Sequence, residues 1–345
     1  MEKHIYRYNQ SFQLELGGTL PFIDITYYTA GTYQADKDNV VWACHTLTAT
    51  ANVFDWWAGL FGKNDVFNPN EHFIICATVL GSCYGTTGPM DAPDGYQYHN
   101  FPKITMRDMV HVHDLLRKYL GIQKIQTLVG ASSGGNQALE WAIINPNLFE
   151  NLIIISGNAT RSPWAIAFSA TQRMAIEADP TWKENQPKAG LNGLKTARAI
   201  AMISYRSYDT YALKQGDINP NIYENFSADS YQRYHGNKIV EHFDAFTYYS
   251  MTLAMDTYNV GRGRGGVLKA LSQITAKTLI MGISTDLLFP VEEQEFLAKH
   301  IEGSELEIIE SPYGHDGFLI EMTEISLNVK HFFENKLREQ VCSFQ

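Results

Sequence analysis

Cysteines, basic side chains and long apolar runs are all scarce in this chain of 345 residues. Its four cysteines form no C-x-x-C pair or evenly spaced array, which argues against a disulfide scaffold and predicts a reducing compartment. Lysine and arginine total 27 against 37 acidic residues, a net charge of −10, so we expect neither nucleic acid nor an anionic membrane surface as a partner. No run approaches the roughly 20 apolar residues of a membrane span, and the N-terminus lacks the apolar region of a signal peptide, so we expect a cytoplasmic protein.

The chain does contain enough apolar material for a large core, because 45% of its residues are hydrophobic and 19% are charged. Short apolar runs bounded by turn residues predict strands buried on both faces, at 40–44, 73–80, 125–129, 152–155, 278–281 and 306–309. Apolar residues at helical spacing follow several of them, at 105–120, 135–145, 291–300 and 318–336. This alternation predicts an α/β fold with a mostly parallel sheet that helices cover on both faces.

The alternation stops between about residue 160 and residue 265. This stretch is rich in Met, Tyr, Ala and Asn, and it has helical patterns but no convincing buried strand. We therefore predict one α/β domain made of residues 1–160 and 266–345, with residues 161–265 inserted between two sheet strands as a helical lid.

A G-x-S-x-G motif lies between a predicted strand and a predicted helix. Gly130-Ala131-Ser132-Ser133-Gly134 follows the strand at 125–129 and opens the helix. Small flanking residues tolerate the strained turn that lifts a serine hydroxyl above the sheet, and the helix N-terminus offers amide donors to a developing oxyanion. Ser132 is therefore the candidate nucleophile, although Gly/Ser-rich turns without catalytic function carry the same motif.

A serine nucleophile needs a general base, usually a histidine that a carboxylate orients. Asp286 lies in the loop after the predicted strand at 278–281, and His315 lies in the loop after the strand at 306–309. The order Ser132, Asp286, His315 is the one that accompanies this motif. For the oxyanion we expect two backbone amides, those of Leu47, after the first clear strand, and Ser133, after the nucleophile.

Several ordered motifs resemble those of the homoserine O-acetyltransferase family, which has the α/β-hydrolase fold. His45-Thr46-Leu47-Thr48 is similar to the family's H-A-L-T segment, and the segment 80–89 is similar to L-G-G-C-Y-G-S-T-G-P. Further resemblances are F-P-x-I-T-I-R-D-M-V at 101–110, the nucleophile turn and its helix at 130–141, and G-H-D-G-F-L at 314–319. The resemblance extends over most of the chain.

The resemblance implies an acyltransferase that moves an acetyl group from acetyl-CoA to the side-chain hydroxyl of L-homoserine, a step of methionine biosynthesis. It implies a two-step reaction through acetyl-Ser132, with acetyl-CoA as co-substrate, no permanently bound cofactor and no metal. It also implies that Arg173 binds the homoserine carboxylate and that Asp316 contacts the amino group. A homodimer through the lid helices is a further implication.

Some residues depart from the family pattern. Ala131, Ser133 and Ala49 replace the family's Gly, Met and Gly, and these small residues preserve the turns. The segment 184–192 lacks the familiar Gly-Gly-Asp-Tyr character, and Phe246 takes a place often occupied by Asn. Other functions stay open on these residues: a serine hydrolase (esterase or thioesterase) with the same triad, a transferase with serine as acceptor, or one with succinyl-CoA as donor.

Overall fold

An eight-stranded sheet forms the centre of the computed structural model, which describes residues 1–342. Its strand order is β1-β4-β6-β5-β7-β8-β9-β10. The six strands β6, β5, β7, β8, β9 and β10 pair in parallel with their neighbours in this order. At one edge of the sheet, β4 pairs with β6 and β1 pairs with β4, both antiparallel. The bounds are β1 Glu2–Tyr8, β4 Ile23–Ala30, β5 Val40–Cys44, β6 Phe73–Ala77, β7 Ile125–Ala131, β8 Phe149–Ile155, β9 Lys277–Ile283 and β10 Glu305–Ile309, with a separate pair β2 Phe12–Gln13 and β3 Thr19–Leu20.

The six predicted strands and the mostly parallel sheet are confirmed, with small differences in their ends. The antiparallel strands β1 and β4 were not predicted, because polar residues interrupt both sequences and neither forms a continuous apolar run; β1, at the sheet edge, has no buried residue. The predicted helix at 105–120 is α1, Met106–Tyr119, which begins at a capping box formed by Thr105 and Asp108.

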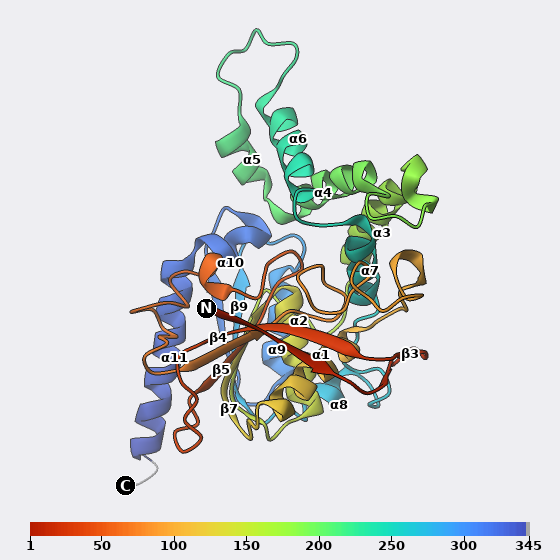
Figure 1. The fold of residues 1–345 in the computed structure, drawn as a ribbon. Helices are drawn as coiled ribbons and strands as arrows, with labels where there is room; N and C mark the ends of the chain where they lie inside the picture. Colours follow the sequence, from red (N-terminus) through yellow and green to blue (C-terminus); the bar gives the residue numbers. More distant parts are fainter. Residues whose placement is uncertain (343–345) are drawn as a thin grey trace.

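Helices cover both faces of the sheet, so alternate strand residues enter two separate cores (Figure 1). On one face, Trp42 of β5 contacts α1 and α2 (Ser133–Ile144), in a core that extends to α9 (Val291–His300). On the other face, Val41 and Ala43 pack with α11 (Met322–Cys342) and with the segment 51–67. The predicted helix at 318–336 is divided between α10 (Gly317–Ile320) and α11.

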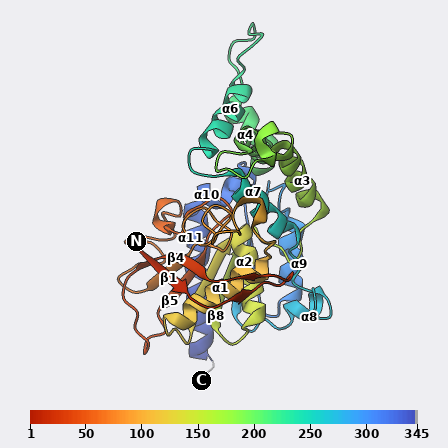
Figure 2. The same cartoon turned by 45° about the vertical axis from the view of Figure 1, so that its right-hand side comes forward.

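A helical insertion separates β8 from β9, as expected. Figures 1 and 2 show its helices beyond one end of the sheet, with α6 projecting farthest from the strands. Its helices are α3 Pro163–Glu177, α4 Leu191–Tyr205, α5 Tyr208–Gln215, α6 Ser227–Ile239 and α7 Ala245–Asp256, and α8 Val267–Leu271 follows before β9. The last three residues of the predicted domain segment 266–345 lie outside the described residues.

A buried carboxylate forms ion pairs that connect the end of this insertion to the sheet domain. Glu140 of α2 is 1% exposed and accepts from Arg107 of α1 at 2.8 Å and from Arg264 at 2.5 Å. Removing one partner of such a buried pair leaves uncompensated charges in a poorly solvated site.

Glu140→Gln should therefore lower the free energy of unfolding by about 3 kcal/mol, because both guanidinium groups lose their shared anion. Urea unfolding followed by circular dichroism measures this loss. The matched control is Asp229→Asn, which breaks the solvent-exposed Arg233 pair on α6 and should leave the midpoint unchanged. Equal midpoints for the two variants would contradict the prediction.

Candidate active site

Ser132 sits at a strained turn between β7 and α2. Its φ is +54°, in the left-handed region that residues other than glycine rarely adopt. The neighbouring glycines leave no room for a side chain: a Cβ on Gly130 would lie 2.2 Å from the Gly134 carbonyl oxygen, and one on Gly134 would lie 2.1 Å from the Cys44 carbonyl oxygen. The G-x-S-x-G spacing therefore follows from close backbone packing, which projects the serine hydroxyl away from the sheet.

The two residues predicted to act with Ser132 lie beside it. The structure places Asp286 after β9 and His315 after β10, and each is 3% exposed. His315 Nδ1 is 2.6 Å from Asp286 Oδ2, and His315 Nε2 is 2.8 Å from Ser132 Oγ. Because an ionised carboxylate can only accept, Nδ1 carries the proton and Nε2 accepts from the serine hydroxyl. This arrangement can remove the Ser132 proton and store it on the imidazole.

Asp286 and His315 are both fixed by further contacts. The second carboxylate oxygen of Asp286 accepts from the amides of Leu288 and Phe289 at 2.8 and 2.9 Å. The Phe289 ring stacks on the His315 imidazole at 5.1 Å between centroids. The loop after β9 therefore sets the orientation of the base through both its backbone and its aromatic side chain.

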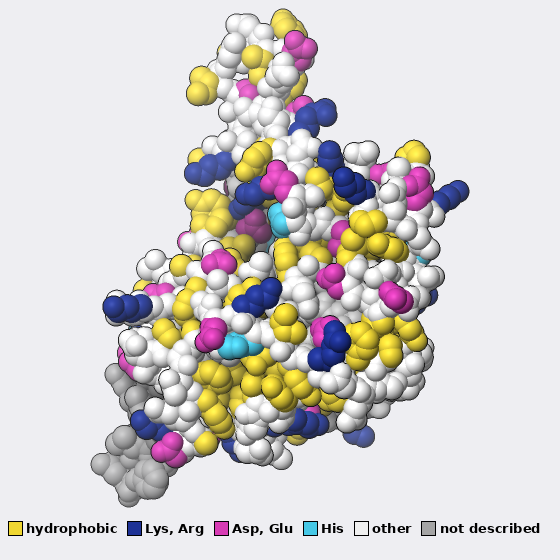
Figure 3. Space-filling model, viewed as in Figure 1, with side chains coloured by type: hydrophobic (Ala, Val, Ile, Leu, Met, Phe, Trp, Pro, Cys, Tyr) yellow, Lys and Arg dark blue, Asp and Glu magenta, His cyan; other side chains and the backbone are white. Residues whose placement is uncertain are grey.

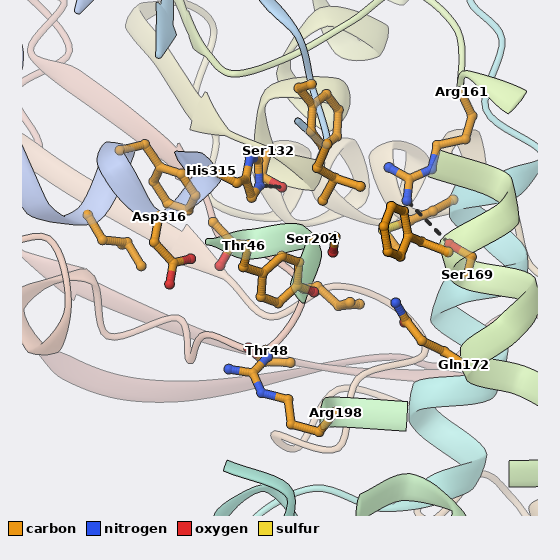
Figure 4. Close-up of a pocket in the computed structure, with 18 residues that line it drawn as sticks. Thr46, Thr48, Ser132, Arg161, Ser169, Gln172, Arg198, Ser204, His315 and Asp316 are labelled. Carbon is orange, nitrogen blue, oxygen red and sulfur yellow. Dashed lines mark hydrogen bonds between the residues drawn. The ribbon is translucent and has the colours of Figure 1, made fainter. Parts of the chain in front are cut away.

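Ser132 opens into a cavity between the sheet domain and the helical insertion, which we call the Ser132 cavity (Figure 4). The sheet domain contributes Leu47, His315 and Asp316, and α4 contributes Arg198 and Tyr205. The amides of Leu47 and Ser133, the predicted oxyanion donors, have no acceptor within the described part of the chain. Both are therefore free to bind a ligand oxygen.

Asp316 and Arg198 give the Ser132 cavity opposite charges. Asp316 pairs with Arg206 at 3.0 Å, and burial raises the pKa of its carboxyl while Arg206, His315 and Arg198 oppose that rise. The Arg198 guanidinium lies over the Tyr205 ring at 5.3 Å. Its Nη1 is buried without a hydrogen-bond partner among the described residues, so it can receive an anionic ligand.

Arg173 does not lie in the Ser132 cavity, contrary to the expected contact with substrate. It is on α3, and its guanidinium donates to Asp256 of α7 at 2.5 Å. Arg173 is therefore not placed to contact a substrate carboxylate beside Ser132 in this structure. The two arginines that do line the cavity are Arg161 and Arg198.

Two arginines of the cavity were missed from the sequence. Arg198 is a charged residue on the otherwise apolar face of α4 formed by Leu194, Ala201 and Met202, a signal that could have drawn attention to it. Arg161 follows β8 and is 9% exposed; its guanidinium lies 5.5 Å from the Phe289 ring and 3.3 Å from Ser169 Oγ. Burial lowers the pKa of Arg161, and no sequence pattern distinguishes this residue from a surface arginine.

Neither a metal site nor a membrane-spanning helix is found among the residues that the structure describes. No group of three or more His, Cys, Asp or Glu side chains there could hold a metal ion. No helix in the same residues has the length and hydropathy to cross a membrane.

Comparison with known proteins shows which family this chain belongs to. Residues 39–321 match the alpha/beta hydrolase fold family. The homoserine O-acetyltransferase of Cyclobacterium marinum is 44% identical over 336 residues, which cover 96% of this chain and 95% of that protein.

Solved structures of similar shape include both transferases and hydrolases. The homoserine O-acetyltransferase of Staphylococcus aureus superposes with a TM-score of 0.81 at 27% identity, covering 96% of this chain and 95% of that chain. An acetylester hydrolase from Corynebacterium glutamicum gives 0.85 at 26% identity, covering 96% of both chains. The fold alone therefore does not separate acyl transfer from hydrolysis. The 44% identity to the homoserine O-acetyltransferase of Cyclobacterium marinum, which extends over 96% of this chain, is more specific than the fold. The chain therefore belongs to the homoserine O-acetyltransferase family within the α/β-hydrolase fold.

Proposed function

We propose that this protein transfers an acetyl group from acetyl-CoA to the side-chain hydroxyl of L-homoserine. The observation that carries the proposal is a Ser132–His315–Asp286 hydrogen-bond chain that opens into a cavity lined by Asp316 and by two arginines, Arg161 and Arg198, each with a buried nitrogen that has no hydrogen-bond partner among the described residues. The first feature suits acyl transfer through serine, and the second suits an acceptor with both a carboxylate and an ammonium group.

In the first half-reaction, Ser132 Oγ attacks the thioester carbonyl carbon while its proton moves to His315 Nε2. The amides of Leu47 and Ser133 stabilise the negative charge that develops on the carbonyl oxygen. The intermediate collapses, the carbon–sulfur bond breaks, and His315 returns its proton to the departing thiolate. The products are free CoA and acetyl-Ser132.

In the second half-reaction, the homoserine hydroxyl gives its proton to His315 as its oxygen attacks the acetyl carbonyl carbon. The same two amides hold the second oxyanion. Collapse breaks the bond to Ser132 Oγ, which recovers the proton from His315. O-acetylhomoserine leaves, and the enzyme returns to its starting state.

The acceptor is recognised through its charged ends. The Arg198 guanidinium can donate two parallel hydrogen bonds to the carboxylate, and Asp316 can accept from the ammonium group. Arg198 is close enough to Asp316 for its positive charge to oppose the rise in the Asp316 pKa that burial causes. One amino acid can therefore bridge them. We further propose that residues 161–265 act as the lid that completes this pocket, because Arg198 comes from α4 and Asp316 from the sheet domain.

Thiol release measured with acetyl-CoA in the presence and absence of L-homoserine tests transfer against hydrolysis. We expect release to depend on homoserine and to match the O-acetylhomoserine formed. Ser132→Ala should reduce turnover by about 10⁶-fold, because no nucleophile remains to form the intermediate. Thiol release that is indifferent to homoserine and yields no ester would instead identify a thioesterase.

Arg198→Lys should raise the KM for homoserine about tenfold or more and leave the KM for acetyl-CoA within twofold, because lysine cannot form the two parallel bonds. Arg173→Lys is the matched control: it preserves the charge beside Asp256 and should change neither KM appreciably. Steady-state kinetics with each substrate varied in turn provides the measurement. A larger increase in the KM for homoserine in Arg173→Lys than in Arg198→Lys would contradict this assignment and indicate that Arg173 binds the carboxylate.

We also propose that the insertion helices form a homodimer contact. Large apolar side chains are exposed on and next to α5 and α6, and Figure 3 shows hydrophobic groups on this projection. They are Tyr208, Leu213, Ile218, Tyr223 and Phe226. A second copy of this chain can cover them, since apolar groups gathered on one projecting surface favour association.

Light scattering after size-exclusion chromatography should give about twice the 39.0 kDa chain mass. Leu213→Asp should shift this value towards the monomer, because it places a charge within the apolar contact. Leu268→Asp is the control, since Leu268 on α8 is similarly exposed (55% against 65%) but lies outside the insertion helices. A monomer mass for the unsubstituted protein would contradict the proposal.

A further inference from the structure

His45 lies at the end of β5, one residue before the peptide group that supplies the candidate oxyanion donor Leu47. The imidazole is 1% exposed, and both of its nitrogens contact backbone groups. Nδ1 lies 2.8 Å from the Thr46 carbonyl oxygen, and the Val79 amide donates to Nε2 at 3.0 Å. A carbonyl can only accept and an amide N–H can only donate, so these partners require a neutral ring protonated on Nδ1.

The contact with Thr46 determines where the Leu47 amide points. The Thr46 carbonyl and the Leu47 N–H belong to one planar peptide group, and all peptide bonds in the described residues are trans. In a trans peptide group, the C=O and N–H bonds point in opposite directions. When His45 holds the Thr46 oxygen, it therefore turns the Leu47 N–H away from itself. Leu47 and Thr46 both line the Ser132 cavity, as Figure 4 shows for Thr46.

A second contact joins this segment to the helix that begins beside the nucleophile. Gln137 of α2 donates from Nε2 to the His45 carbonyl oxygen at 3.2 Å. The other side-chain atom of this amide, Oε1, lies 3.1 Å from His113 Nε2. The Ser133 amide is the first N–H of the same helix. The Leu47 amide, in the segment after β5, and the Ser133 amide, at the start of α2, are thus linked by buried hydrogen bonds that fix their relative positions.

We propose that His45 is a positioning residue for the oxyanion site, holding the Thr46–Leu47 peptide group so that the Leu47 N–H faces the carbonyl oxygen of the acyl group on Ser132. The inference rests on the proposed function only in taking Ser132 as the nucleophile. His45 itself takes no proton in the reaction. Burial lowers its pKa to about 4, so the neutral ring that the two contacts require persists at neutral pH.

Two substitutions separate the two contacts of His45. In His45→Asn, the side-chain nitrogen takes the place of Nδ1 and can still donate to the Thr46 oxygen, but nothing accepts from Val79. In His45→Gln, the longer amide takes the place of Nε2 and can accept from Val79, but the Thr46 oxygen loses its donor. If His45 acts through the Thr46–Leu47 peptide group, Asn must preserve catalysis better than Gln.

The test measures acylation of Ser132 directly, as the burst of p-nitrophenol released from p-nitrophenyl acetate by the full-length protein in a stopped-flow instrument. We expect His45→Gln to slow the burst about 100-fold, the effect of losing one oxyanion donor, and His45→Asn to slow it less than about tenfold. Substrate affinity should change less than twofold in both variants. The pH profile should keep its shape, because the substitutions leave the general base His315 in place.

His72→Asn is the matched control. His72 also places Nδ1 near a backbone carbonyl oxygen, that of Asn68 at 3.3 Å, but it lies outside the Ser132 cavity. We expect its burst rate to equal that of the unsubstituted protein. Thermal unfolding of all variants identifies any that fail to fold, and the rates are compared among folded variants.

Equal burst rates for the Asn and Gln variants, or a faster rate for Gln, would overturn the inference, as would a loss confined to substrate affinity. Absence of a burst in the unsubstituted protein would instead contradict acylation of Ser132 and thus the proposed function. A normal burst that both substitutions leave unchanged would contradict the role of His45 alone. The two failures are therefore distinguishable.

Discussion

Backbone contact between the turn at Ser132 and the end of β5 is the constraint on which the active-site geometry depends. Gly134 packs against the Cys44 carbonyl oxygen so closely that no side chain fits between them. This contact brings the first turn of α2 beside the segment that contains Leu47. It also requires the positive φ of Ser132, and the surrounding strands β5, β7 and β8 sustain that strained conformation. The nucleophile and both candidate oxyanion donors therefore follow from one packing arrangement.

The charged part of the site depends on two separate segments of the chain meeting. Asp316 follows β10, whereas Arg198 lies in the middle of α4 and Arg206, the partner of Asp316, directly follows the last residue of that helix. The negative charge that faces the cavity therefore comes from the segment after β10, and the positive charge of Arg198 comes from α4. Because the surroundings are poorly solvated, each charge acts more strongly there than at an exposed surface. The ion pair with Arg206 orients Asp316, so in the proposed function this arginine supports recognition of the acceptor without touching it.

The parts that could be predicted from sequence are those that local patterns determine. Buried parallel strands form continuous apolar runs, and turn residues directly after them predicted Ser132, Asp286 and His315, which the structure brings within hydrogen-bond distance. The position of Arg173 depends on how α3 packs against α7, which no local pattern specifies. Phe246 is another such case: it departs from the family residue, and its ring packs against Trp182 and His99 from distant parts of the chain.

The central claim is that Ser132 carries the acetyl group between donor and acceptor. Mass spectrometry of the intact protein, mixed with acetyl-CoA and no acceptor, tests this claim most directly. The account predicts a gain of about 42 Da, the mass of one acetyl group replacing a hydrogen, located on Ser132 by peptide mapping and removed when L-homoserine is added. An unmodified protein that still converts both substrates to O-acetylhomoserine, or an acetyl group on another residue, would contradict it.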